Sequence, residues 1–508
     1  MLDLLGDAPD DLVSAVLQRA RALTIESDSA HGRYNLGNAL RTIGLPWAAA
    51  REFRKAIALA PAFATAIGNL ANIGREQLPL HPDATVPPEP EIVPPSAPEV
   101  AERLKHWLAV PRAAVSESAI LGAYHRALSL DPLDSEIWGN LGLAYLTRAR
   151  GTEAERAFRT ALAVSPGSAR AHFDLGCVLD DRLPPDAAIL AYSRSLDVKA
   201  DHVLARWNRS LLDLLNGDCE RGWPGYEWRW RKPDSPHRSL DAPLWAGEPL
   251  AGRTLLLHTE QGFGDTLMVV RFVHRLIAEG HRVAIQCQPA LVRLLSRIPG
   301  VDAVVSSSDP LPRFDLHLPM MSLPGTLGIG LADLPGPCPY VSTEASAVDR
   351  WRRRFAGRRG PRVGLCWKGN PRFVGDRLRS PGFDAIRPIS AFLGERAVCL
   401  VRELEDEPLS DYGIEDVHSE LDDFAETAAM MSALDLIVTS DTAVANLAGA
   451  LGLDVWVMLP YIPDWRWLRD RTDSPWYPSA RLFRQSRPGS WPEVAKAIRA
   501  SLAERFSA

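Results

Sequence analysis

A short polar run, Ser440-Asp441-Thr442-Ala443, follows a segment with the length and β-branched composition of a strand, Leu434–Thr439. Its side-chain oxygens are of the kind that caps a helix, and small residues suited to a helix come next. The free N–H groups and the dipole at such a helix start favour a phosphate. The same pattern is also typical of an ordinary capped βαβ unit, so both interpretations stay open.

A second candidate is the motif Glu-Gln-Gly-Phe-Gly-Asp, which ends at Asp265 and follows a predicted strand, Thr254–His258. Gly262 and Gly264 lack the Cβ atom that would keep a ligand away from the backbone. Leu267 stands where the third glycine of a dinucleotide fingerprint would be, so that fingerprint is not supported. Asp265 could act as a general base, or it could complement the dipole at the start of a helix.

A third group follows another predicted strand, Val363–Trp367. Lys368 comes directly after that strand, Asn370 lies two residues on, and Arg377 lies in the polar segment beyond. Lys368 could neutralise a diphosphate held at the helix start described above, although cations in loops are commonly just solvated. The aromatic segment Pro463–Trp467 is either a lid over a cleft or a packed plug, and its pattern does not distinguish the two.

The bulk composition restricts the class of protein. The chain has 508 residues, enough for about three domains, with 46% apolar residues as in an ordinary globular protein. A net charge of -6 creates no general field for nucleic acid. Six scattered cysteines without a C-x-x-C pair favour a reducing compartment over a zinc site or disulfide framework. The acidic N-terminal segment differs from a signal peptide, and aspartates interrupt the longest apolar region. We therefore expect a cytoplasmic protein with no membrane span.

The first 200 residues carry a 34-residue period. One copy matches the tetratricopeptide (TPR) pattern at Trp138, Leu141, Gly142, Tyr145, Ala154, Phe158, Ala161 and Pro166. Further copies begin at Arg33 and His172, and another ends at Pro132. In this pattern large residues pack between two helices and small residues let the helices approach. The period therefore predicts an all-helical repeat solenoid.

Two segments depart from the repeat. Residues 79–98 contain eight prolines and are not expected to be helical. The pattern also degrades after Val203, where five tryptophans follow: Trp207, Trp223, Trp228, Trp230 and Trp245. We interpret these as packing that seals the end of the solenoid against the next domain. A ligand-stacking platform is the less favoured interpretation, because large aromatic side chains mostly serve burial.

After Gly252 predicted strands and helices alternate, which indicates parallel sheets covered by helices. A Pro- and Gly-rich seam divides this half into two regions, and the arginine-rich run 350–362 is interpreted as a solvated interdomain helix. The expected domains are a repeat domain at 1–235 with the insertion at 79–98, an α/β domain at 250–340 and a second at 345–508. In paired sheets of this kind, ligands bind in the cleft at the carboxyl ends of the strands.

The repeats and the motifs G-F-G-D, W-K-G-N-P and S-D-T-A-V-A-N-L-A-G-A-L-G together resemble the bacterial tetratricopeptide-repeat glycosyltransferases. Their C-terminal half is similar to the heptosyltransferases of glycosyltransferase family 9. The resemblance extends from about residue 30 to 500 and implies a multidomain fold, a TPR solenoid followed by a GT-B fold of two α/β Rossmann-like domains. It also implies a metal-independent enzyme without a cofactor, which moves a sugar from a nucleotide-sugar donor to a protein docked by the repeats. Some members resemble flagellin glycosyltransferases.

The resemblance assigns roles to the motif residues, with Asp265 as the catalytic base. The donor-binding set it implies is Gly262, Gly264, Lys368, Asn370, Arg377, Ser440, Asp441, Thr442, Ala443 and Asn446. The chain departs from the family pattern at Asn446, where a histidine is expected, and at Phe373-Val374, where a His-Lys pair is expected. Asparagine does not titrate near neutral pH as histidine does. These changes indicate a different donor or a weaker catalyst.

Three functional hypotheses follow. The leading one is a glycosyltransferase, whose donor base (UDP, ADP, GDP or CMP) the residues leave open. The competing one is a non-catalytic adaptor with a degenerate nucleotide-sugar domain, which Asn446, Phe373 and Val374 favour. A sugar-nucleotide epimerase is a weaker third, because it has no evident use for the repeats.

Overall fold

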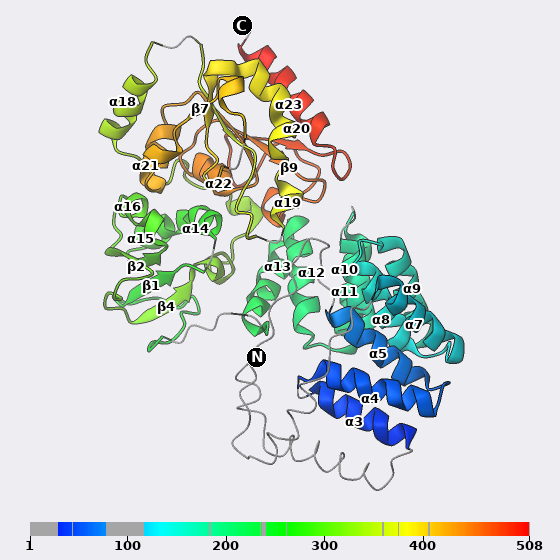
Figure 1. Ribbon diagram of the computed structural model, residues 1–508. Coiled ribbons are helices and arrows are strands. Elements are labelled where there is room, and N and C mark those ends of the chain that lie inside the picture. Colours follow the sequence, from blue (N-terminus) through cyan, green and yellow to red (C-terminus); the bar gives the residue numbers. More distant parts are fainter. Residues whose placement is uncertain are drawn as a thin grey trace, which may run out of the picture. The chain divides into compact units, whose positions relative to one another are not determined.

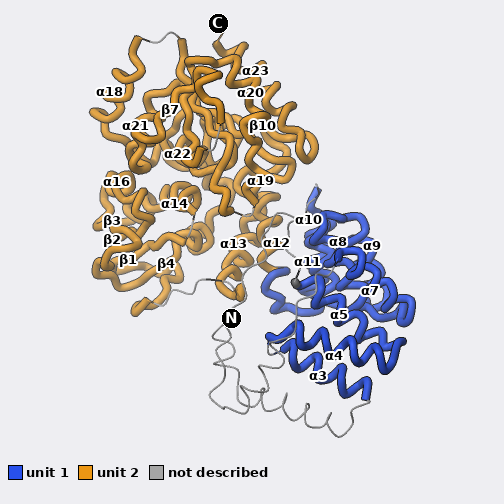
Figure 2. Tube along the Cα trace, in the orientation of Figure 1, with its two compact units in different colours: residues 1–205 blue, residues 206–508 orange. Residues whose placement is uncertain are grey.

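The computed structural model divides into two compact units, unit 1 at residues 1–205 and unit 2 at residues 206–508 (Figure 2). It describes residues 29–42, 44–77, 116–180, 182, 184–233, 235, 240–260, 262–357, 360–373, 375–404 and 407–506. The proline-rich segment 79–98 and Val374 lie outside the described residues. In the described part of the chain, none of the helices has both the length and the apolar character that a membrane crossing requires.

Unit 1 is built from helices that pack in consecutive pairs (Figure 1). Its described helices are α3 (Ala30–Thr42), α4 (Pro46–Leu59), α5 (Ala64–Gln77), α7 (Glu117–Leu130), α8 (Ser135–Leu146), α9 (Gly151–Val164), α10 (Ala169–Asp180) and α11 (Asp186–Val198). The next helix, α12 (Val203–Leu215), crosses the boundary between the two units.

The glycines of the repeat explain why the two helices of a pair approach closely. At three of them, a Cβ atom would lie only 2.5 or 2.6 Å from the ring of an aromatic residue sixteen positions on. These pairs are Gly37 with Phe53, Gly142 with Phe158, and Gly176 with Tyr192. Phe53, Phe158 and Tyr192 are completely buried. The predicted TPR-like helical repeats are therefore confirmed, and this small-against-large packing allows the close approach of the two helices in a pair.

The first half of unit 2 contains a four-stranded parallel sheet, sheet A, in the order β3-β2-β1-β4. Its strands are β1 (Thr254–His258), β2 (Arg282–Cys287), β3 (Ala303–Ser306) and β4 (Leu316–Pro319). Its helices are α13 (Cys219–Tyr226), α14 (Phe263–Val269), α15 (Val273–Ala278), α16 (Val292–Leu295) and α17 (Leu323–Thr326). The 3-10 helix η1 (Glu227–Arg231) continues α13.

The second half contains a six-stranded parallel sheet, sheet B, in the order β10-β9-β8-β5-β6-β7. Its strands are β5 (Val363–Cys366), β6 (Ala397–Cys399), β7 (Glu415–Asp416), β8 (Leu436–Ser440), β9 (Val455–Leu459) and β10 (Ala480–Arg484). Its helices are α18 (Ala345–Arg354), α19 (Asp376–Arg379), α20 (Gly382–Leu393), α21 (Phe424–Met431), α22 (Ala443–Ala450) and α23 (Trp491–Phe506).

The strand orders locate the places where ligands bind in such sheets. Sheet B has the doubly wound order, which reverses direction between β5 and β8. Sheet A reverses between β1 and β4. The crevice beyond the carboxyl ends of strands at a reversal is the usual ligand position. The predicted α/β region with parallel sheets is confirmed, and the motif residues follow β1, β5 and β8.

Candidate functional site

The loop after β1 places Asp265 in the first turn of α14, as the motif predicted. Gly262 caps that helix, and a Cβ atom on Gly262 would lie 2.8 Å from the Asp265 carboxylate oxygen Oδ2. The glycine therefore lets the carboxylate lie against the backbone. The other oxygen, Oδ1, accepts a hydrogen bond from Arg466 in a close ion pair. The Asp265 side chain is 33% exposed, so solvent still reaches it.

Arg466 lies in the aromatic segment that the sequence left as a lid or a plug. It belongs to the 3-10 helix η9 (Trp465–Trp467), which Asp464 caps. Its guanidinium also donates to Asp464 at 2.6 Å and lies over the Trp465 ring. Trp465 and Trp467 are 5% and 1% exposed. The segment is therefore a packed plug, and its Arg466 places a positive charge next to Asp265, the predicted base.

The loop after β8 is buried at its start. Thr442 caps α22, and its hydroxyl accepts a hydrogen bond from the Val444 N–H. Ser440 is fully buried, and its hydroxyl has no hydrogen-bond partner among the described residues. Burial raises the pKa of Asp441 to about 6, and the nearby Asp464 carboxylate acts in the same direction. This helix start thus combines the buried Ser440 hydroxyl with the acidic side chain of Asp441.

The loop after β5 contains Lys368, whose ammonium forms an ion pair of 2.7 Å with Glu407. Both side chains are mostly buried, at 16% and 11% exposure. Asn370 is exposed, and its side-chain oxygen accepts from the Arg372 N–H. Arg377 is also exposed. The structure thus places Lys368 at the reversal of sheet B, with its charge already balanced within the chain.

Arg379, a cation whose charge acts on Asp441, was not among the site residues predicted from the sequence. Its charge acts on Asp441 and lowers the pKa of that carboxyl, although burial dominates and the net shift is upward. Arg379 is held by Asp376 at 3.0 Å. Its i,i+3 spacing from Asp376 on a short helix was the available signal. Among the described residues, no cluster of three or more His, Cys, Asp or Glu side chains could hold a metal ion.

Asn446, which replaces the expected histidine, lies where the two halves of unit 2 meet. It is 4% exposed, donates to the Thr442 carbonyl at 3.0 Å and accepts from the Tyr477 hydroxyl at 2.7 Å. A Cβ atom on Gly264 would lie 2.8 Å from the Asn446 amide nitrogen and 3.8 Å from the Ala443 Cα atom. The starts of α14 and α22 therefore pack directly on each other, and the asparagine fills the contact.

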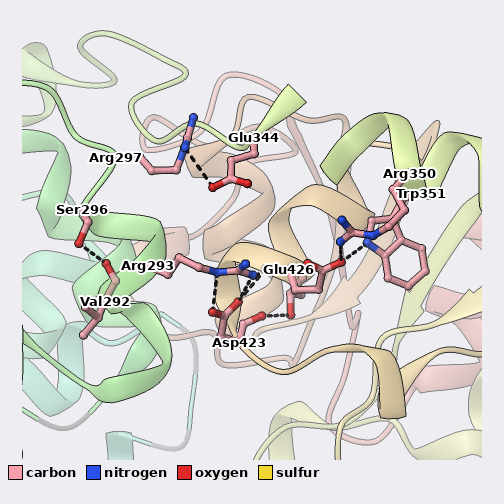
Figure 3. A network of polar contacts seen from close by, with 10 residues as sticks. Val292, Arg293, Ser296, Arg297, Glu344, Arg350, Trp351, Asp423 and Glu426 are labelled. Carbon is pink, nitrogen blue, oxygen red and sulfur yellow. Dashed lines mark hydrogen bonds and ion pairs between the residues drawn. The ribbon is translucent and has the colours of Figure 1, made fainter. Parts of the chain in front are cut away.

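A separate polar network joins the two halves through α16, α18 and α21 (Figure 3). Arg293 of α16 makes two hydrogen bonds of 2.8 Å to Asp423, which caps α21. Glu426 of α21 accepts hydrogen bonds from Arg350 and from the Trp351 indole of α18. The arginine-rich helix was interpreted as solvated, but Arg350 has this specific partner.

The chain is similar to a curated protein. The chain is 25% identical to Protein FlbA of Caulobacter vibrioides over 425 residues, which cover 75% of this chain and 70% of FlbA. No protein-family model matches.

Two solved structures illustrate the structural likenesses. The pilF protein of Pseudomonas aeruginosa is 17% identical with a TM-score of 0.33, over 46% of this chain and 95% of that protein. YrrB, described as a TPR protein with an unusual peptide-binding site, is 15% identical with a TM-score of 0.28, over 42% of this chain and 93% of that protein.

Proposed function

We propose that unit 2 is a metal-independent glycosyltransferase with the GT-B arrangement of two Rossmann-like domains, and that it takes a sugar from a nucleotide-sugar donor. One observation carries the proposal. The helices that begin after β1 and β8, far apart in the sequence, pack together at Gly264 and Asn446. Strand β1 lies where the strand order of sheet A reverses, and strand β8 lies where the strand order of sheet B reverses. The usual ligand crevice of each sheet therefore adjoins the contact between α14 and α22.

The donor phosphate would bind at the start of α22. Backbone N–H groups and the helix dipole favour an anion there, and the buried Ser440 hydroxyl is a donor without a partner among the described residues. Lys368 at the end of the neighbouring strand would exchange Glu407 for the phosphate and balance the charge that develops on the leaving group.

Asp265 would take the proton from the acceptor hydroxyl. Arg466 engages Oδ1, so Oδ2 is the oxygen that accepts the proton. As the acceptor oxygen bonds to the anomeric carbon of the sugar, the bond from that carbon to the phosphate breaks and the nucleotide leaves with the electron pair. The ion pair with Arg466 would orient the Asp265 carboxylate before the acceptor arrives.

A matched pair of variants tests the role of Asp265. Asp265→Asn and Asp464→Asn each remove one carboxylate partner of Arg466, so their structural effects are similar. We expect Asp265→Asn to lower the turnover of a nucleotide-sugar donor about 10²–10⁴-fold, since it removes a positioned base. Asp464→Asn should lower it less than about tenfold. Turnover is measured as nucleotide release, after calorimetry against UDP-, ADP-, GDP- and CMP-sugars identifies the donor.

A second candidate function is a non-catalytic adaptor, and one observation favours it. Asp265 and Lys368 are both ion-paired within the chain, as in a degenerate site. Binding of a nucleotide sugar without turnover, or equal turnover in the two asparagine variants, would favour this candidate over transfer.

We further propose that the repeats of unit 1 dock the acceptor protein, for which flagellin is a candidate. TPR-like repeats build an extended surface from successive helices, and such surfaces bind other chains. Removal of residues 1–200 leaves α12 (Val203–Leu215) whole. We expect this truncation to abolish transfer to a protein while donor affinity stays within about threefold. A parallel loss of donor binding would instead make the repeats a support for unit 2.

A further inference from the structure

A cavity of about 510 Å³ lies in unit 2 at the carboxyl ends of β1 and β4. His258, the last residue of β1, and Pro319, the last residue of β4, both line it. These two strands are where the order of sheet A reverses, which is the usual ligand position in an open parallel sheet. The volume lies in the range of small-molecule sites.

Three of the tryptophans interpreted from the sequence as packing line this cavity: Trp223, Trp230 and Trp245. The Trp223 indole donates to the Ile329 carbonyl and the Trp245 indole to the Glu248 carbonyl, both at 2.7 Å. Because these N–H groups are bonded to the backbone, the rings are fixed and can offer a ligand only carbon surface. The walls are therefore rigid and aromatic before any ligand arrives.

A few polar groups complete the lining. The rings of His258 and His317 are buried and joined by a hydrogen bond of 3.2 Å. Glu227 accepts from the Ser322 hydroxyl at 2.9 Å, and both residues line the cavity. A mostly apolar pocket with a small set of fixed donors and acceptors is typical of a site that orients a polar ring.

The charge around the cavity disfavours an anion. The described residues that line it include the carboxylate of Glu227 but no lysine or arginine. The neighbouring Arg229 is buried and is held by Glu227 at 2.7 Å and by Glu260 at 2.8 Å. A phosphate or a sugar acid would therefore meet the Glu227 carboxylate, while the charge of the neighbouring Arg229 is already balanced by Glu227 and Glu260.

We propose that this cavity binds a neutral pyranose, with one C–H face of the sugar against the indoles and its hydroxyl groups on the histidine pair and Glu227. The positive C–H edges of the sugar match the negative faces of the aromatic rings. The inference does not rest on glycosyl transfer, because the cavity is lined by residues other than Asp265, Lys368 and Ser440.

The test is saturation-transfer NMR and calorimetry of the full chain with neutral methyl glucosides, galactosides and mannosides. Trp230→Ala removes a half-buried wall and should lower affinity about tenfold. Its matched control is Trp228→Ala in the same 3-10 helix η1. Trp228 packs against Arg206 and Arg231 and does not line the cavity, so this variant should bind like the parent. Leu244→Ala trims an exposed lining residue without risk to the fold and should lower affinity about twofold.

A charge test separates a sugar from a cation. Glu227→Gln keeps the size of the side chain but replaces a charged acceptor by a neutral one, so it should lower pyranoside affinity by about tenfold or less without abolishing binding. Tetramethylammonium and a methyl glucuronoside serve as the cationic and anionic probes, and both should bind more weakly than the neutral sugars. Any of three results overturns the proposal: no pyranoside binding at about 50 mM, equal losses in the two tryptophan variants, or preferred binding of tetramethylammonium that Glu227→Gln abolishes.

Discussion

Two groups of charged side chains join the sheet A half of unit 2 to the sheet B half, and they are built in opposite ways. The fastening cluster consists of Arg293, Arg350, Asp423 and Glu426 (Figure 3). Its positive and negative charges are equal in number, and its two arginines are 49% and 56% exposed.

The plug cluster consists of Asp265, Asp441, Asp464 and Arg466. Arg466 pairs with Asp265 and Asp464, and the charges of both Arg379 and Arg466 act on Asp441. Arg466 is 13% exposed.

The pKa of Asp441 in the plug cluster is raised, whereas the pKa values of Asp423 and Glu426 in the fastening cluster are lowered. Burial raises the pKa of Glu426, but the hydrogen bonds from Arg350 and Trp351 outweigh burial, so the pKa lies below its usual value. At Asp441 burial prevails, and the pKa rises to about 6. The first arrangement stabilises the fold. The second costs stability, and acids kept in such a place are typical of functional sites.

Among the variants compared, loss of Arg466 should lower the free energy of unfolding the most. Arg466→Met keeps the length of the side chain but removes the cation that pairs with Asp265 and Asp464. We expect it to lower the free energy of unfolding of unit 2 by about 3 kcal/mol, the low end for a broken buried pair because Asp265 and Asp464 are one-third exposed. Arg293→Met in the fastening cluster should cost about 1 kcal/mol or less. Urea denaturation followed by tryptophan fluorescence measures both, and equal losses would erase the distinction between the clusters.

Replacing Asp441 by asparagine should change the stability of the protein in the opposite direction from the same replacement at Asp423. Since the folded pKa of Asp441 lies above its usual 3.8, its contribution to stability is present at low pH and is lost as pH rises through about 6. Asp441→Asn should therefore stabilise the protein at about pH 7.5, by on the order of 2 kcal/mol, and have little effect near pH 4.

Asp423→Asn is the matched control. Burial raises the Asp423 pKa, but the hydrogen bonds from Arg293 outweigh it and the pKa is lowered. This variant should therefore lose stability at neutral pH. Denaturation curves of both variants at the two pH values measure these changes in the free energy of unfolding. A loss of stability in Asp441→Asn at neutral pH would contradict the prediction that the charged Asp441 carboxylate destabilises the fold.

Much of this fold was predictable because it depends on local patterns. The strand predicted at Thr254–His258 has the bounds of β1, and the strand predicted at Val363–Trp367 begins where β5 begins and ends one residue later. Three strands were missed. β4 (Leu316–Pro319) has four residues, including a histidine and a terminal proline, and β7 (Glu415–Asp416) has only two residues, both acidic. β10 (Ala480–Arg484) is an edge strand with two arginines among its five residues. Short or half-polar strands carry too little hydrophobic periodicity to be recognised before their neighbours are known.

The site was less predictable because its contacts are long-range. The sequence placed Asp265 at the start of a helix, and the structure agrees. Nothing in the local pattern showed that Arg466 would pair with it, or that Asn446 would fill the contact beside Gly264. The tryptophans around the cavity were read as packing because composition alone does not show which faces of a ring remain open.

The smallest expected effect concerns Glu426, and it tests whether the fastening cluster is purely stabilising. Glu426 has a lowered folded pKa, so its contribution is present above its usual value of 4.5 and is lost as pH falls below it. Glu426→Gln should therefore cost about 1 kcal/mol at about pH 7 and progressively less below about pH 4.5. Glu344→Gln is the control, since Glu344 is half exposed and holds Arg297 at 3.4 Å, so its effect should be near zero at both pH values. A loss in Glu426→Gln that did not change with pH would assign the role of this side chain to packing against Trp351 instead of to its charge.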